Sequence, residues 1–223
     1  MTANGITQIV LYLVVLTVLA YPLSIYMARI YSSTLRLPRW LTAPERGFYR
    51  LVGTRADEEQ GWKPYAVTAL VFMAVFAVLL YLLQRLQGHL PLNPDGLPGV
   101  SSWVSMNTTA SFVTNTNWQY YGGEYTMSYL TQMAGLAVQN FVSAALGMAV
   151  LVAVIRGFAR RSTSTVGNFW VDLYRSLVYI LLPLAAIVAV LLISQGVVQT
   201  FDGAATATTL EGAQQTIARG QAE

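Results

Sequence analysis

The stretch that decides the fold runs from Ala110 to Glu124 and reads ASFVTNTNWQYYGGE. It is polar, rich in Asn and Thr, and uncharged until its last residue. It follows a short apolar segment and lies between two long apolar runs. Inside a bilayer, a polar and non-helical backbone is tolerated only where it is buried in protein or lines a water-filled path. The stretch therefore predicts such a path, provided that the apolar runs around it cross a membrane.

Four apolar runs are each long enough to cross a bilayer, which takes about 20 apolar residues. They are Ile6–Ala28, Tyr65–Leu83, Met133–Ile155 and Ser176–Val198, and none of them contains a charged residue. No Lys or Arg precedes Arg29, so the first run lacks the basic leader of a signal peptide and is expected to remain as a span. A chain that is 55% hydrophobic and 10% charged fits this interpretation better than a soluble domain.

The composition also excludes several kinds of site. The chain has no cysteine, so disulfides and thiolate metal sites are excluded, and its single histidine, His89, cannot form a multi-histidine metal site. We expect His89 to be a solvated loop residue. The net charge of +3 is explained by membrane topology, so no nucleic-acid partner is expected.

The basic residues are distributed unevenly between the loops. Seven of the 13 lie between the first two spans, and four lie between the third and fourth. Because cytoplasmic loops carry the excess of Lys and Arg, both loops are predicted to be cytoplasmic. The N-terminus, the segment 84–132 and the tail after the fourth span are then outside. The Arg-rich segment Arg156–Arg175 could contact anionic lipid or a protein partner, and lipid proximity alone explains it.

The segment between the second and third spans has an internal plan. Turn-forming Gly, Pro and Asn residues fill its first part, 84–99. From Val100 to Val113, apolar residues recur at spacings of three and four, which predicts a helix with Ser101 or Ser102 as its N-cap. About 14 residues give roughly 21 Å, too short to cross a 30 Å hydrocarbon core. We therefore expect a half-helix that enters the membrane and returns.

After this half-helix, Thr114–Asn117 is expected to run back outward in extended form, with Gly122 and Gly123 permitting the return turn. This order of elements, a span, a half-helix, a polar return and a second span, is that of a potassium-channel pore unit. In such a unit, carbonyl oxygens replace the hydration shell of the ion, and the negative end of the helix dipole points toward the cation.

Several longer motifs carry a resemblance to a known family. They are SFVTNTNWQ (Ser111–Gln119), PLNPDGLPG (Pro91–Gly99), QMAGLAVQNFVSAA (Gln132–Ala145), STVGNFWVDL (Ser164–Leu173) and LEGAQQ (Leu210–Gln215). In these motifs the sequence resembles the potassium-binding A subunit of the Kdp potassium-transporting ATPase, a bacterial potassium pump. The resemblance covers the whole chain but less than half of a family member.

The resemblance implies an all-α integral membrane protein with four transmembrane helices and one re-entrant pore half-helix, the first unit of a potassium-channel-like fold. The expected parts are an extra N-terminal span (1–30), a cytoplasmic basic loop (31–64), the first pore unit (65–156), a second cytoplasmic loop (157–175) and the start of a truncated second unit (176–223). The pore unit divides into span 65–83, half-helix 100–113, filter 114–117 and span 133–155. A recurring word, AVLL at Ala77–Leu80 and Ala189–Leu192, hints at the second unit.

The resemblance also implies the site. Thr114, Asn115, Thr116 and Asn117 fall on the first filter segment, where mostly backbone carbonyls would bind K⁺, and Gln119 lies just beyond. The alternative for Thr114–Asn117 is an ordinary capped turn, and for Gln119 a hydrogen bond to the half-helix. Trp118, Tyr120 and Tyr121 are expected to be packing and interface anchors.

Within the third span, Gln139 and Asn140 are candidates for interhelical hydrogen bonds. Gly135, Ser143 and Gly147 are expected to permit close helix packing.

The implied function is potassium binding and uptake from the outer face as a non-catalytic subunit. No organic cofactor is expected. The expected partners are a P-type ATPase catalytic subunit, small accessory subunits and membrane lipids, in a bacterial inner membrane with the N-terminus outside. Three alternatives remain open: a fragment without independent transport, a passive potassium channel or symporter subunit, and an intramembrane enzyme, for which no nucleophile–base spacing is found.

Overall fold

The computed structural model describes residues 2–161, 163–197 and 200–217. Four helical segments in this part of the chain are long and apolar enough to cross a membrane, which confirms the predicted number of spans. They are α1 (Ala3–Tyr31), α3 with the short helix η1 (Trp62–Leu86 and Gln87–His89), η2 with α6 (Thr131–Ala137 and Val138–Ala159), and α7, η3 and α8 (Phe169–Tyr174, Arg175–Leu181 and Leu182–Ser194). Both η2 and η3 are π-helical.

The fourth segment differs most from its predicted range. It begins at Phe169 rather than Ser176, and its helix ends at Ser194. The predicted end, Val198, lies outside the described residues. The earlier start places Asp172 and Arg175 inside the segment. The apolar pattern could not show this, because both charges are compensated by residues from distant parts of the chain.

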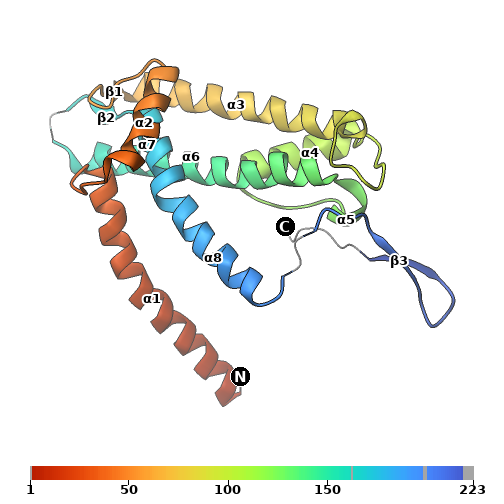
Figure 1. Cartoon of the computed structure of the whole chain (residues 1–223). Coiled ribbons are helices and arrows are strands. Elements are labelled where there is room, and N and C mark those ends of the chain that lie inside the picture. Colours follow the sequence, from red (N-terminus) through yellow and green to blue (C-terminus); the bar gives the residue numbers. More distant parts are fainter. Residues whose placement is uncertain (1, 162, 198–199, 218–223) are drawn as a thin grey trace.

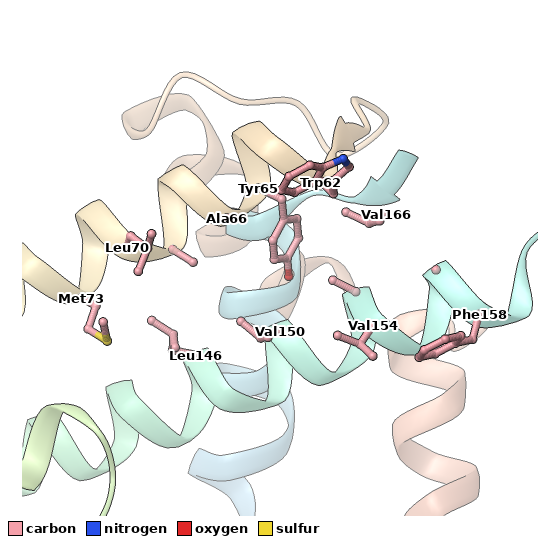
Figure 2. A pocket seen from close by; sticks show the side chains of 13 residues that line it. Trp62, Tyr65, Ala66, Leu70, Met73, Leu146, Val150, Val154, Phe158 and Val166 are labelled. Atoms are coloured by element: carbon pink, nitrogen blue, oxygen red, sulfur yellow. The ribbon is translucent and has the colours of Figure 1, made fainter. Parts of the chain in front are cut away.

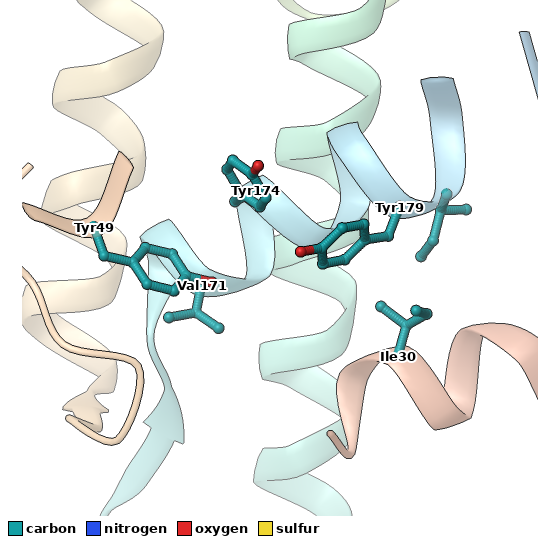
Figure 3. Packing of buried hydrophobic residues seen from close by; sticks show 6 residues of the cluster. Ile30, Tyr49, Val171, Tyr174 and Tyr179 are labelled. Atoms are coloured by element: carbon teal, nitrogen blue, oxygen red, sulfur yellow. The ribbon is translucent and has the colours of Figure 1, made fainter. Parts of the chain in front are cut away.

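The two basic loops meet at one end of the molecule. Strand β1 (Gln60–Gly61) from the first loop pairs antiparallel with β2 (Thr165–Gly167) from the second. The first loop also contains α2 (Arg39–Leu51), an amphipathic helix that the sequence analysis treated as part of a loop. Buried aromatic and aliphatic residues join α1, α2, α7 and η3 there: Ile30, Tyr49, Val171, Tyr174, Tyr179 and Ile180 (Figure 3).

At the other end, α4 (Ser102–Val113) packs against α3 and α6, and Figure 1 shows the three helices side by side. Helix α3 and η2 approach closely at Gly135, where a Cβ atom would lie 2.8 Å from Leu83. The packing role predicted for Gly135 is thus confirmed. Gly147 makes no such close approach in the part of the chain that the structure describes, where a Cβ atom would meet nothing within 4 Å, so its packing role stays a prediction. Of the two amides in α6, Gln139 is buried and Asn140 is exposed.

Helices α1 and α8 extend away from this group (Figure 1). In α8 no residue is buried, and none is buried in the apolar window of α1. Beyond α8, strands β3 (Ala205–Thr208) and β4 (Gln214–Ile217) form an antiparallel hairpin. The prediction of an all-α chain is therefore wrong in detail, since the described part is mainly helical with two short two-stranded ribbons.

Candidate ion-binding site

Helix α4 begins where the sequence predicts. The Ser101 side chain accepts a hydrogen bond from the backbone N–H of Val104 at 3.4 Å, which confirms Ser101 as the N-cap. The helix has 12 residues, about 18 Å of rise, so it is too short to cross a bilayer.

The face that α4 buries is polar along most of its length and apolar at its C-terminal end, where Phe112 and Val113 are buried. Ser105 and Thr108 are fully buried, whereas Trp103 and Met106 are 85% and 61% exposed. The Gln84 side chain of α3 donates to Thr109 at 3.1 Å across the helix contact. The apolar period thus identified the helix, although Trp103 and Met106, which belong to it, face outward. Inside a membrane, small polar residues are suited to close helix contacts that are held by hydrogen bonds.

The C-terminal end of α4 is a Schellman motif. The N–H of Asn115 donates to the carbonyl of Phe112 at 3.2 Å, and the N–H of Thr116 donates to that of Ser111 at 2.9 Å. Asn115 has φ +56°, the left-handed conformation that Asn tolerates better than most residues. Asn117 also has positive φ, at +55°, although the cap does not require it.

The structure therefore contradicts the expected extended form of Thr114–Asn117, because a regular strand has negative φ at every residue. The expected turn at Gly122 and Gly123 is also different. Gly122 is extended with φ −89°, and Gly123 opens the short helix α5 (Gly123–Thr126). Positive φ, which the turn was expected to need at glycine, is found at Asn115 and Asn117 instead.

Five consecutive backbone N–H groups, those of residues 114–118, turn back to the end of α4. The N–H groups of residues 114 and 115 donate to the main-chain carbonyls of Ala110 and Phe112, respectively. Those of residues 116 and 117 both donate to the carbonyl of Ser111. The fifth, from Trp118, donates to Ser111 Oγ at 2.6 Å. The chain has no cis peptide bond among its described residues. In a trans peptide the C=O points opposite to the following N–H, so the carbonyls of residues 113–117 point away from the helix end.

The side chains of the predicted filter pair with one another in an alternating pattern. The hydroxyls of Thr114 and Thr116 lie 2.8 Å apart, and Asn117 donates to the side-chain oxygen of Asn115 at 3.2 Å. The structure thus brings the four predicted residues together as one polar segment. All four are exposed, and so is Gln119.

The aromatic residues that follow divide into two groups. Trp118 and Tyr120 are 76% and 74% exposed, whereas Tyr121 is half-buried against a cluster containing Leu80 and Phe112. The prediction of packing anchors is confirmed for Tyr121. His89 is exposed, as predicted.

A buried ion pair that was not predicted from the sequence lies near the end where the basic loops meet. Arg156 of α6 donates to both carboxylate oxygens of Asp172 of α7, at 2.5 and 2.8 Å. The Tyr65 hydroxyl lies 3.2 Å from the same carboxylate. Arg156 was assigned to the lipid-facing basic segment, but its charge is compensated inside the protein. The only signal in the sequence was an acidic residue, Asp172, shortly before the predicted start of the fourth apolar run at Ser176.

A second buried carboxylate, Glu45 of α2, accepts hydrogen bonds from Tyr49 at 2.6 Å and from Tyr179 at 2.8 Å. Arg175 lies 3.5 Å from it. Burial, followed by the contact with Glu45, raises the pKa of Tyr49, so this hydroxyl stays protonated and donates. This cluster anchors the amphipathic helix to the fourth apolar segment.

A cavity of about 590 Å³ lies between α3 and α6 (Figure 2). Its walls are aliphatic and aromatic side chains such as Met73, Leu146 and Phe158, with the Tyr65 hydroxyl already hydrogen-bonded to the Ala149 carbonyl at 2.8 Å. Such walls offer no set of oxygen ligands for a cation. The segment after α4 is therefore the better candidate for ion binding.

Comparisons with known proteins show the family of the chain. A family model described as potassium-transporting ATPase A subunit matches residues 10–222. Among similar proteins, potassium-transporting ATPase potassium-binding subunits from Sorangium cellulosum and Herpetosiphon aurantiacus are 58% and 55% identical over 95% and 100% of the chain. One from Brucella anthropi is 54% identical over 99% of the chain.

The chain spans 37–40% of the length of these three relatives. Because the family model covers nearly all of its residues, and because four helices are suited to crossing a membrane, the assignment does not depend on a single motif. This chain belongs to the potassium-transporting ATPase A subunit family and is a multi-pass membrane protein.

Proposed function

We propose that this chain is part of the potassium-binding, channel-like subunit of an ATP-driven potassium uptake pump. In this proposal α3, α4 and η2–α6 form one pore unit, within the range 65–156. Helix α4 is its re-entrant half-helix, and Thr114–Asn117 supply one side of the selectivity filter, with Gln119 at its outer edge. The range 1–30 is the extra span, and 176–223 begins a second unit.

The orientation of the carbonyls is the observation that carries the proposal. The N–H groups of residues 114–118 are used by the end of α4, so the oxygens of 113–117 are directed away from it. A regular strand would direct successive carbonyls to opposite sides, whereas positive φ at Asn115 and Asn117 breaks that alternation. A dehydrated K⁺ needs a row of such oxygens, and the negative end of the α4 dipole adds to the attraction.

The exposure of the segment supports the same function. Every residue of 114–120 is exposed, although this polar run lies between apolar spans. A filter needs contributions from several sides, and the relatives extend well beyond the matched region. We therefore propose that further pore units of the complete subunit cover this surface.

The orientation in the membrane follows from the basic loops. Their strands β1 and β2 pair, and Arg160 of the second loop donates to Glu59 of the first at 2.9 and 3.0 Å. Two loops in contact lie on one side of a bilayer, and their Arg content favours the cytoplasm. We propose a bacterial inner-membrane protein with its N-terminus and filter mouth outside.

The expected partners are a P-type catalytic subunit that hydrolyses ATP, small accessory subunits and lipids. The printed name of the relatives, a potassium-binding subunit of a transporting ATPase, supports an assembly of this kind.

Two other functions remain as alternatives to be tested. A passive channel or symporter subunit would use the same pore unit without ATP, and the chain of 223 residues alone could lack independent transport. An intramembrane enzyme is not favoured, since the buried Asp172 and Glu45 are each engaged by Arg and Tyr.

The decisive experiment measures potassium uptake in cells that lack other high-affinity uptake systems. The subunit is expressed from its complete locus with its partner subunits. We expect ATP-dependent uptake, and a change in K⁺ affinity or in K⁺ over Rb⁺ preference for Asn115→Ala and Gln119→Ala. His89→Ala, an exposed outer residue away from the filter, is the control. Unchanged kinetics in both filter variants would contradict the filter assignment, and uptake without ATP would favour the passive alternative.

A further inference from the structure

Gln87 occupies the junction between α3 and η1, at the end of the molecule that carries the candidate filter. Its side chain is fully buried, with 0% exposure. A buried amide must satisfy two donors and an acceptor oxygen, or it destabilises the fold. The position is therefore informative about what surrounds it.

The Gln87 side chain makes four hydrogen bonds. Its Nε2 donates to the carbonyls of Pro98 at 2.8 Å and Thr126 at 2.7 Å. Its Oε1 accepts from the backbone N–H of Ser128 at 3.0 Å and from the hydroxyl of Thr131 at 3.0 Å. Both N–H groups and both lone pairs of the amide are thus in use.

These partners lie on both sides of the candidate filter in the sequence. Pro98 belongs to the segment that leads into α4, whereas Thr126, Ser128 and Thr131 belong to the return from the filter to the third span. We call the segment 98–131, which contains α4 and the candidate filter, the α4–filter loop. The Gln87 side chain joins the entrance and the exit of this loop and attaches both to the end of α3.

The entrance side is held tightly to α3 by other contacts as well. The N–H of Val100 donates to the carbonyl of Gln84 at 3.0 Å, and Arg85 donates to the carbonyl of Val100. A Cβ atom at Gly99 would lie 2.4 Å from the carbonyl of Arg85, so the chain passes there as close as only glycine permits. Because these contacts hold the entrance of the loop against α3, the hydrogen bonds of Gln87 to the exit side fix the distance between the entrance and the exit.

We propose that Gln87 is a positioning residue for potassium selectivity, which sets the spacing of the filter oxygens by tying the two ends of the α4–filter loop together. The inference rests on the proposed function. Gln87 does not contact the ion. It acts through the backbone of residues 98–131, which carries the filter oxygens. Because K⁺ and Rb⁺ differ so little in radius, a small change in the spacing of these oxygens alters the preference between the two ions. Binding geometry is held by such supporting hydrogen bonds around a site.

The test uses the complete pump, with Gln87→Met as the main variant. Methionine keeps the length of the side chain but removes all four hydrogen bonds. We expect the apparent KM for K⁺ to rise about tenfold and the ratio of Rb⁺ to K⁺ affinities to move toward one, with the maximal rate of transport less affected. Gln132→Met is the matched control, since it removes two donor bonds, to Gly123 and Met127, from the exit side only.

A second variant keeps the test valid if Gln87→Met does not assemble. Thr131→Val removes one of the four bonds, and with it the 3.1 Å hydrogen bond between the hydroxyls of Thr131 and Ser128, with almost no change in volume. We expect a rise in KM of about threefold with the same direction of change in selectivity. An unchanged affinity ratio in both variants would overturn the inference, as would an equal change in Gln132→Met. A wild-type complex without potassium-dependent ATP hydrolysis would instead refute the proposed function.

Discussion

The guanidinium group of Arg156 and the carboxylate of Asp172 form a two-pronged ion pair between α6 and α7, with N–O distances of 2.5 and 2.8 Å. Their side chains are 15% and 1% exposed, and Tyr65 of α3 contacts the same carboxylate. The pair therefore joins the two spans of the proposed pore unit to the start of the next span. It lies at the end opposite to the candidate filter.

Removing one partner of this pair should destabilise the chain strongly. In Arg156→Ala the buried Asp172 would be left without its cation, which costs about 3–5 kcal/mol in comparable buried pairs. Thermal unfolding of the purified protein in detergent measures the loss. Arg160→Ala is the control, because Arg160 and Glu59 are 36% and 41% exposed and such pairs contribute about 1 kcal/mol or less. Equal melting temperatures for the two variants would contradict a structural role for the buried pair.

Gly167 should tolerate no side chain. A Cβ atom there would lie 2.2 Å from Arg156 Nη1, and the residue has φ +113°, which L-residues rarely adopt. We expect Gly167→Ala to lower the free energy of unfolding by about 1–3 kcal/mol, through both backbone strain and displacement of the guanidinium. Gly157→Ala, at a helical position where a Cβ atom meets nothing within 4 Å, should be neutral or slightly stabilising. A stable Gly167→Ala protein would show that the ion pair can move.

The contact between the two basic loops should weaken in acid. A hydrogen bond from Thr165 is the largest effect on the Glu59 carboxylate and lowers its pKa from the ordinary value of 4.5. Burial opposes this lowering of the pKa, and hydrogen bonds from Arg160 add to it. Because the pKa is lower in the folded state, this stabilisation is present above pH 4.5 and is lost as the pH falls through the lowered pKa. The stability difference between wild type and Glu59→Gln should therefore shrink on acidification in that range. A difference that grows on acidification would contradict the assignment.

The spans and the short helix could be predicted because length and composition determine them. A run of about 20 uncharged residues has few alternatives to crossing a bilayer. Ser101 could be identified as a cap because capping depends on neighbours only a few residues away. The face of α4 could not be predicted from the same pattern, because Trp103 and Met106 face outward and the small polar side packs inside.

The geometry of the candidate filter was harder to predict. The sequence indicated a polar return, but the left-handed φ of Asn115 and Asn117 depends on the cap of α4 and on the path of the chain beyond it. Gln87 gave no local signal of its role, and Asp172 was visible only as an acidic residue shortly before the fourth apolar run. The hydrogen-bond partners of Gln87 lie up to 44 residues away in the sequence, and those of Asp172 lie up to 107 residues away. Such contacts are set by tertiary packing and leave no period in the sequence.

Ser111 should be the most sensitive position of α4 for ion binding. Its Oγ accepts the N–H of Trp118 at 2.6 Å, the last of the amides that turn the oxygens of the candidate filter outward. In Ser111→Ala that amide loses its acceptor, so the preceding peptide plane can rotate and its carbonyl can leave the ion. We expect the apparent KM for K⁺ to rise about three- to tenfold in the complete pump, since one hydrogen bond contributes about 0.5–1.5 kcal/mol. Ser105→Ala is the matched control, because Ser105 is buried in the same helix but its hydroxyl donates to the carbonyl of Val100 at the opposite end, at 3.4 Å. If both serine variants raised KM equally, the effect would come from α4 stability, and the outward carbonyls would not be the ion ligands.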